Sequence, residues 1–274
     1  PGGRQALCEI SYPRGSLPMT CLFCNSDGPF TREHVIPASL GNDDLVLVNE
    51  VCAGCNDHFS RKVEAPVLSK SPLAFWRAFL GIRTRRGRQP SVDLSQPAAQ
   101  KGRLPSIHPL HDNGVCLAAH DDGSVSVDID DPQIVREIVN GTREQFRFVF
   151  TPNVLFDFGR FLCKVGIELL CSADPVRARH GFLDEARRFA RYGNDGSLWP
   201  IFHFSEGCIG DLKQVNSDEK GAVEEVTCYT YALLEVPPKY LLLQLGGGTD
   251  RWIIGLDDPF PTPDIRTAFP GRDL

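Results

Sequence analysis

The sequence predicts an α+β protein in which a small zinc-stapled unit is followed by a mixed α+β C-terminal domain. Two Cys-x-x-C pairs, Cys21–Cys24 and Cys52–Cys55, bracket two strand-like runs. Apolar residues recur at helical spacing over residues 153–171, and strand-like runs return after residue 199. With 274 residues, the chain can bury one large core or two modest ones.

The two cysteine pairs indicate a structural zinc site. Cys24 and Cys52 are separated by 27 residues, and four thiolates suit tetrahedral zinc. Four cysteine ligands leave no open coordination position, so this zinc would hold a segment that is too small for a core of its own. The other six of the ten cysteines show no pairing pattern, which favours a reducing, cytoplasmic location.

Three parts are predicted along the chain. Residues 1–18 are rich in Gly and Pro and are expected to be an upstream extension or a segment introduced by cloning. Residues 19–104 would form the zinc-bearing unit with a basic helical extension. Residues 105–274 would form an α+β domain for recognition, regulation or assembly, and the Pro/Gln/Ser-rich stretch that ends near Pro105 marks the boundary.

In the zinc-bearing unit, strands are expected over residues 30–36 and 45–51, where β-branched and apolar residues dominate. A helix is expected from Asn56 to about residue 68. A second helix begins at Ser71-Pro72, with serine as the N-cap and proline in the first turn, and ends at Gly81.

The C-terminal part alternates between strands and helices. Asp121-Asp122-Gly123 predicts a hairpin turn. On the 153–171 helix, Arg160, Lys164 and Glu168 lie four residues apart on a polar stripe, and nothing marks Lys164 as catalytic. Arginines of a further helix, over 174–191, fit nucleic-acid contact or a solvated face equally well. The other expected elements are strands 115–119, 124–129, 146–150, 199–204, 227–235, 239–245 and 251–256, and a short helix over 132–140.

Two short motifs between and after the cysteine pairs could do chemistry. Glu33-His34 lies at the end of a predicted strand, where the imidazole could take a proton from water at neutral pH. Asn56-Asp57-His58 lies at a helix start, where the dipole favours anions. Taken alone, each motif also fits a purely structural role. Glu33-His34 could be a surface Glu beside a structural His, and Asn56-Asp57-His58 could be a simple N-cap.

Together with the cysteines, these motifs resemble the zinc-bearing branch of the HNH (ββα-metal) endonuclease family. The resemblance covers about residues 21–61, with the order Cys-x-x-C, Glu-His-Val-Ile-Pro, Leu-Gly and Cys-x-x-C-Asn. It implies that His34 is the general base that activates water. It also implies that Glu33 and Asn56 hold one catalytic divalent ion, Mg²⁺ or Mn²⁺, with a structural Zn²⁺ on the cysteines.

The sequence departs from the family pattern at the middle Asn. That residue usually lies about five positions before the third cysteine, where this chain has Leu47. Asn49 is the nearest Asn and could orient His34, and Asn42 is a weaker candidate. His58 could replace or supplement Asn56 as a ligand of the catalytic ion.

Charge is segregated along the chain despite a net charge of −6. Residues 61–103 have ten Lys and Arg against two acids, whereas residues 192–274 have six against thirteen. Lys and Arg contacts to phosphates supply sequence-independent nucleic-acid affinity. We therefore expect a nucleic-acid-binding role for Arg61, Lys62, Arg77, Arg83, Arg85, Arg86 and Arg88.

The resulting hypothesis is a metal-dependent HNH endonuclease that hydrolyses phosphodiester bonds in DNA, with RNA as the other substrate and, by analogy, a context of restriction or phage defence. One alternative is a non-catalytic, zinc-stabilised nucleic-acid-binding module. Another is a nuclease effector that a partner or ligand activates through residues 105–274, which could also form a homo-oligomer. Neither a signal peptide nor a membrane-spanning helix is expected, since no run of about 18 apolar residues occurs.

Overall fold

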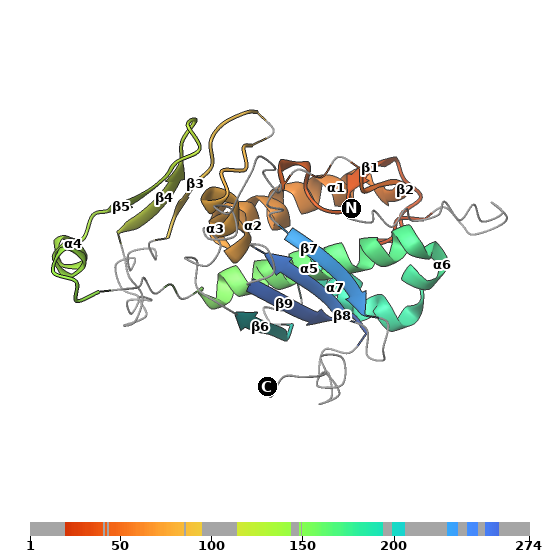
Figure 1. The fold of residues 1–274 in the computed structure, drawn as a ribbon. Helices are drawn as coiled ribbons and strands as arrows, with labels where there is room; N and C mark the ends of the chain where they lie inside the picture. Colours follow the sequence, from red (N-terminus) through yellow and green to blue (C-terminus); the bar gives the residue numbers. More distant parts are fainter. Residues whose placement is uncertain are drawn as a thin grey trace, which may run out of the picture.

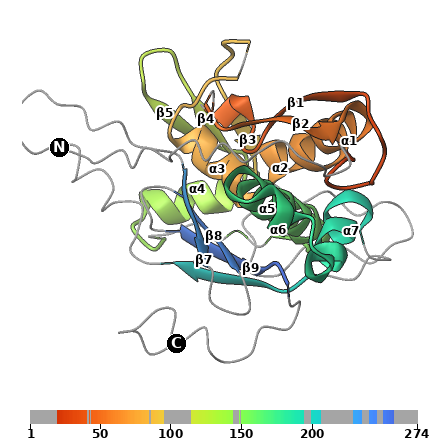
Figure 2. The same cartoon turned by 90° about the vertical axis from the view of Figure 1, so that its right-hand side faces the viewer.

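A long central helix, α5 (Pro152–Ala173), separates the two main parts of the protein (Figures 1 and 2). The cysteine-bearing hairpin and helices lie on one side of α5, and a four-stranded sheet lies on the other. The expected α+β class is confirmed. This computed structural model describes residues 20–40, 42, 44–84, 86–94, 114–143, 148, 150–193, 199–205, 229–234, 240–245 and 250–257.

The N-terminal unit is an antiparallel hairpin followed by a helix. Strand β1 (Phe30–His34) pairs with β2 (Val46–Cys52), and helix α1 (Ala53–Phe59) follows β2 directly. The helix starts three residues before the expected Asn56, because the Cys52 side chain accepts a hydrogen bond from the Cys55 N–H and so caps it. The chain continues as a short 3-10 segment, η1 (Ala38–Leu40), between the strands, and as η2 (Ser60–Glu64) and α2 (Ala65–Lys70) after α1.

The next helix and a small sheet form a lobe at one end of the molecule (Figure 1). Helix α3 (Pro72–Phe79) begins as predicted, with the Ser71 hydroxyl accepting from the Leu73 N–H. The sheet has the order β3-β4-β5, and helix α4 follows it. Strand β3 was expected to be part of a linker; it forms because Val92 is buried against α3. The elements are β3 (Ser91–Asp93), β4 (Val115–Ala119), β5 (Val125–Ile129) and α4 (Pro132–Val139).

After α5, the single helix expected over 174–191 is broken into α6 (Pro175–Ala178), η3 (Gly181–Leu183) and α7 (Asp184–Tyr192). Arg179 ends the first piece, and His180 starts the second, because its ring accepts a hydrogen bond from the Phe182 N–H at 3.4 Å. The Arg187 guanidinium donates to the Ala178 carbonyl at 2.6 Å, so this backbone group has a partner at the break between the helices.

The four-stranded sheet is antiparallel and has the order β6-β9-β8-β7. One of its faces packs on α5 at close range: a Cβ at Gly166 would meet Leu256 at 2.7 Å and Leu241 at 3.2 Å. Most of the strand expected over 146–150 lies outside the described residues. The strands are β6 (Ile201–Ser205), β7 (Tyr229–Leu234), β8 (Tyr240–Leu245) and β9 (Asp250–Gly255).

One hydrophobic core joins these parts, with members from Cys21 to Leu256. It includes residues on both sides of the predicted boundary near residue 105, so the separation into 19–104 and 105–274 stays a prediction. None of the helices in the described ranges has the length and apolar character that a membrane span requires.

Candidate active site and metal centre

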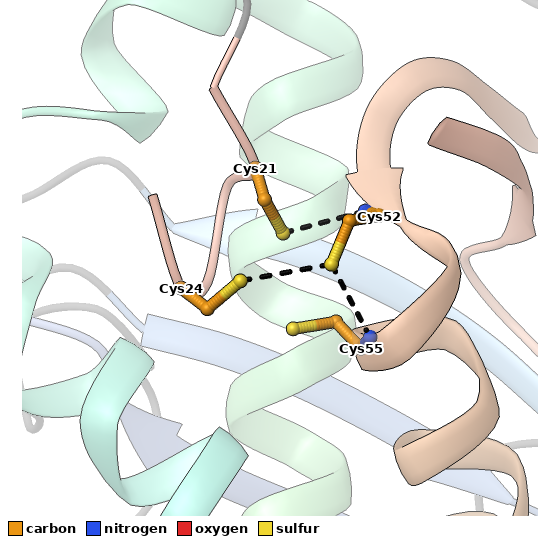
Figure 3. Close-up of side chains that lie close together, drawn as sticks. All are labelled: Cys21, Cys24, Cys52 and Cys55. Carbon is orange, nitrogen blue, oxygen red and sulfur yellow. Dashed lines mark hydrogen bonds between the residues drawn. The ribbon is translucent and has the colours of Figure 1, made fainter. Parts of the chain in front are cut away.

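The four cysteines of the two pairs converge on one point (Figure 3). Cys21 and Cys24 come from a turn before β1, in which the Asn25 N–H donates to the Cys21 carbonyl at 3.0 Å. Cys52 ends β2 and Cys55 lies in α1. All four Sγ atoms lie within 4.8 Å of one another, so the cluster is positioned to bind a metal ion. Four sulfur donors suggest structural zinc.

The cysteine cluster is also bound by a cation from the C-terminal region. Arg191 of α7 donates from Nε to the Cys55 Sγ at 3.2 Å.

A hydrogen bond from Cys55 lowers the pKa of Cys21 to about 4, so a thiolate forms readily there. Two backbone N–H groups point at the sulfurs as well: Cys52 N to Cys21 Sγ at 3.3 Å and Cys55 N to Cys52 Sγ at 3.4 Å. Such outer contacts orient metal ligands and stabilise their charge.

The hairpin contains a β-bulge that decides where Asn49 lies. Thr31 pairs with Val51 but Arg32 pairs with Val48, so Asn49 and Glu50 are extra residues on β2. Asn49 is exposed and adopts a left-handed conformation with φ of +64°, which Asn tolerates. His34 pairs with Val46 at the start of β2, on the N-terminal side of Asn49. The orienting role for Asn49 stays a prediction.

Asn42 organises the loop between the two strands. Its buried amide donates to the Ile36 carbonyl at 2.7 Å and to the Leu45 carbonyl at 3.1 Å, and accepts from the Leu45 N–H at 3.0 Å. These three bonds tie the segment after His34 to the start of β2. Asn42 therefore contacts the backbone of the hairpin loop.

His34 ends β1 with a partly exposed side chain. The strand before it is fixed to α1, because the Asn56 Nδ2 donates to the Arg32 carbonyl and to the Thr31 Oγ1, both at 2.9 Å. Arg32 is exposed and lies two residues before His34, on the same face of β1. Asn56 thus fixes β1 on the N-terminal side of His34.

Glu33 points the other way and is 3% exposed. Its Oε1 lies 2.7 Å from the Nζ of Lys164, which comes from the middle of α5. Burial raises the pKa of Glu33 above its ordinary value, and Lys164 opposes that shift. Burial would lower the pKa of Lys164, but its carboxylate neighbours, Glu168 first, raise it, so the amine stays charged.

His58 is bound to a second residue of α5. Its Nε2 lies 3.0 Å from the Arg160 Nη2, and because a guanidinium can only donate, this nitrogen accepts. Desolvation, followed by the positive charges of Arg191 and Arg160, lowers the pKa of His58. The ring is therefore neutral at pH 7.

Each predicted ligand of the catalytic ion is bound to another partner. Glu33 is bound to Lys164, His58 to Arg160, and Asn56 to β1. In the part of the chain that the structure describes, the group of His, Cys, Asp and Glu side chains placed to hold a metal is the cysteine cluster. The donor set predicted from the sequence does not fit a divalent ion in this arrangement, and the ligand roles stay a prediction.

The predicted nucleic-acid-binding residues divide by exposure. Arg61 and Lys62 are exposed just after α1, although Arg61 pairs with Asp57. Arg83, Arg86 and Arg88 are exposed in the turn between α3 and β3, and Arg83 also contacts Asp121 at 3.1 Å. Arg77 is 8% exposed and donates to the Ile82 carbonyl at 3.3 Å, which does not suit a phosphate contact. Arg85 lies outside the described residues.

The hairpin, the helix and the cysteine cluster define a small ββα module whose cysteines are positioned to bind a metal ion. Residues 21–71 of this module match the model of a protein family described as HNH endonuclease, so the resemblance to that family is confirmed over this segment. The comparisons with curated proteins and with solved structures returned no match.

Sequence reasoning missed the basic side chains that reach the module from the C-terminal helices. Arg160, Lys164 and Arg191 contact His58, Glu33 and Cys55, and Arg179 pairs with Glu50. The sequence contains one signal of these contacts: Arg160, Lys164 and Glu168 interrupt a largely apolar stretch. The structure buries every residue from Phe158 to Cys171, so charged residues there have to find partners in the interior.

Proposed function

We propose that this protein is a metal-dependent HNH endonuclease that hydrolyses phosphodiester bonds in DNA. The family match supports a nuclease in general, and the observation that favours catalysis is the setting of His34. This imidazole is partly exposed at the end of β1, on a strand that is fixed by Asn56. A positioned imidazole suits the removal of a proton from an attacking water.

The substrate assignment rests on exposed cations of the module. Arg32 precedes His34 on the same face of β1, and Arg61 and Lys62 follow α1; all three are exposed. These cations can bind the phosphates that flank a scissile bond without reading sequence. In this proposal they hold the nucleic-acid backbone while His34 accepts the proton of the water.

Dependence on Mg²⁺ or Mn²⁺ belongs to the proposal through the family resemblance. A hard divalent ion would supply charge stabilisation at the phosphate when bound. We assign no step to the ion, since Glu33, Asn56 and His58 are engaged with other partners.

The test is cleavage of supercoiled plasmid by the full chain with Mg²⁺ or Mn²⁺, with and without EDTA. Wild type should nick the plasmid only in the arms that contain a free divalent ion. His34→Ala should be about 10²–10⁴-fold slower, the usual cost of losing a general base. His180→Ala, on an exposed His outside the module, is the matched control and should cleave as wild type does.

Absence of nicking in every metal arm would refute the enzyme. The engagement of Glu33 by Lys164 favours the competing class, a non-catalytic, zinc-stabilised module that binds nucleic acid. That module would still shift labelled DNA in a binding assay. Normal cleavage by His34→Ala would instead refute the assignment of the base.

A nuclease effector that a partner or ligand activates is a second candidate. The observation in its favour is the set of buried contacts from α5 and α7 to the module, through Lys164 and Arg191. A shift of α5 or α7 would therefore move the side chains that contact Glu33 and Cys55. Activity that appears only after addition of a cell extract or a nucleotide mixture, and that still needs His34, would support this candidate.

A further inference from the structure

Lys164 lies in a charged cluster in the interior of the protein, with Glu64 at its partly exposed edge. Its side chain is fully buried, and its Nζ lies 2.7 Å from Glu33, 2.9 Å from Glu64 and 3.0 Å from Glu168. The same nitrogen donates to the His34 carbonyl at 2.9 Å and to the Val35 carbonyl at 3.3 Å. An ammonium group has three N–H donors, so five oxygens around it fix its position firmly.

The hydrogen bonds from Lys164 fix the backbone carbonyls of His34 and Val35, which follow the His34 Cα directly. The Val35 N–H is bound in turn to the Leu45 carbonyl at 3.1 Å. On the N-terminal side of His34, the Asn56 amide donates to the Arg32 carbonyl. The end of β1 is therefore bound by α1 before His34 and by α5 after it.

The contact with Glu33 fixes the direction of the side chains. Successive residues of a strand point to opposite faces, so a Glu33 that faces the interior turns His34 outward. An unpaired carboxylate at this depth would be costly, and the ammonium of Lys164 compensates its charge. Lys164 thereby stabilises the orientation in which His34 faces solvent.

From this geometry we infer that Lys164 is a positioning residue of the nuclease site: it fixes the backbone at His34 and holds Glu33 on the opposite face of β1. The inference rests on the proposed function. It assigns a role in the reaction to the C-terminal region, which supplies Lys164 from outside residues 21–71.

Two other roles for Lys164 lead to different results. If it only stabilises the fold, the folded fraction of a Lys164 variant should cleave at the wild-type rate. If it competes with a divalent ion for Glu33, removing it should lower the metal concentration that gives half-maximal cleavage. A positioning residue changes the rate at saturating metal and leaves that concentration unchanged.

The test compares Lys164→Met with Arg187→Met in the full, zinc-loaded chain, below the melting temperature of each. Arg187 is also a buried cation that donates to backbone carbonyls, but the bonds described for it reach Ala178, Arg179 and His180, and its ion pair is with Asp184 of its own helix. Lys164→Met should lower the single-turnover rate at saturating Mn²⁺ by about 10²-fold, as expected for a misplacement near 1 Å. Arg187→Met should cleave within about threefold of wild type.

A double variant separates backbone positioning from charge compensation and guards against misfolding. Lys164→Met with Glu168→Gln removes both charges of a fully buried pair, so it should fold more readily than Lys164→Met alone. If Lys164 positions His34, the double variant stays about 10²-fold slow, whereas Glu168→Gln alone retains most of the rate. Recovery of the wild-type rate in the double variant would overturn the inference.

Amide hydrogen exchange gives a readout that does not need activity. In Lys164→Met, peptides that cover residues 33–47 should exchange at least about tenfold faster than in wild type, and peptides that cover α1 should not change. Unchanged exchange at 33–47 would overturn the inference even if cleavage were lost. If wild type never cleaves, the proposed function fails, and the exchange measurement still decides whether Lys164 fixes β1.

Discussion

Arg191 on α7 donates from its Nε to the Cys55 Sγ at 3.2 Å, so a cation from the C-terminal region touches a predicted zinc ligand. Four thiolates around one Zn²⁺ carry a net charge of about −2, which a nearby guanidinium stabilises. The cysteine cluster of the N-terminal module is therefore contacted by a residue 136 positions away in the chain.

Arg191→Met should weaken zinc retention without removing a ligand. Loss of an outer contact to a metal ligand usually costs about 10–100-fold in affinity. The measurement is competition for zinc between the protein and a coloured chelator, after elemental analysis has established about one zinc per wild-type chain. Arg188→Met, on an exposed neighbour in α7, is the control and should retain zinc as wild type does. Equal retention by both variants would show that the Arg191 contact has no effect on zinc affinity.

Asn42→Ala should destabilise the zinc-loaded protein by about 2–4 kcal/mol, because three buried hydrogen bonds are lost and backbone groups of the loop are left unpaired. Asn42→Asp should destabilise it as well, since a carboxylate lacks the two N–H donors. Denaturant unfolding measures both effects. Asn140→Ala, at an exposed helix end, should stay within about 0.5 kcal/mol of wild type. A loss from Asn42→Ala no larger than this would contradict the role of Asn42 in the loop.

Local sequence signals predicted the elements that position the site. The cysteine spacing, the two strand runs, the Ser71 cap and the period of 153–171 each depend on neighbours within a few residues. The partners of Glu33 could not be found in this way. Strand alternation allows Glu33 to face inward, but the cation that meets it lies on α5, 131 residues later.

Two further differences have local causes that periodicity does not reveal. Val92 and Leu94 are the apolar residues of an otherwise polar stretch, and β3 forms because Val92 is buried against α3 with Leu94 packed beside it. The helix expected over 174–191 breaks because side chains of His180 and Arg187 satisfy backbone groups at the break. In both cases tertiary contacts override the local pattern.

Glu168→Gln should change how stability depends on pH. Burial raises the pKa of Glu168 well above its ordinary value, so the folded state binds a proton more tightly than the unfolded state does. The contribution of Glu168 is fully present below about pH 4.5, the ordinary value, and is lost as pH rises through the raised pKa. The melting temperature of Glu168→Gln, relative to wild type, should therefore be higher at pH 8 than at pH 5.

Thermal unfolding of both proteins over pH 5–8 measures this difference. Gln has nearly the same shape as Glu, so packing changes little. The Lys164 ion pair does not reverse the sign, because that amine remains protonated throughout this range. A difference between the melting temperatures that is constant with pH, or that falls as pH rises, would contradict the assignment.

The exposed arginines of the turn before β3 should contribute to nucleic-acid binding through phosphates. Arg86→Ala with Arg88→Ala should weaken binding to duplexes of any sequence and reduce the slope of log affinity against log salt by about 1–2. Both side chains are exposed, whereas Arg77 is buried, so Arg77→Ala should lower folding stability and leave the slope unchanged. Arg136→Ala, on an exposed residue of α4, is the matched control. Fluorescence anisotropy at several salt concentrations measures the slope, and an unchanged slope in the double variant would indicate a solvated face that takes no part in binding.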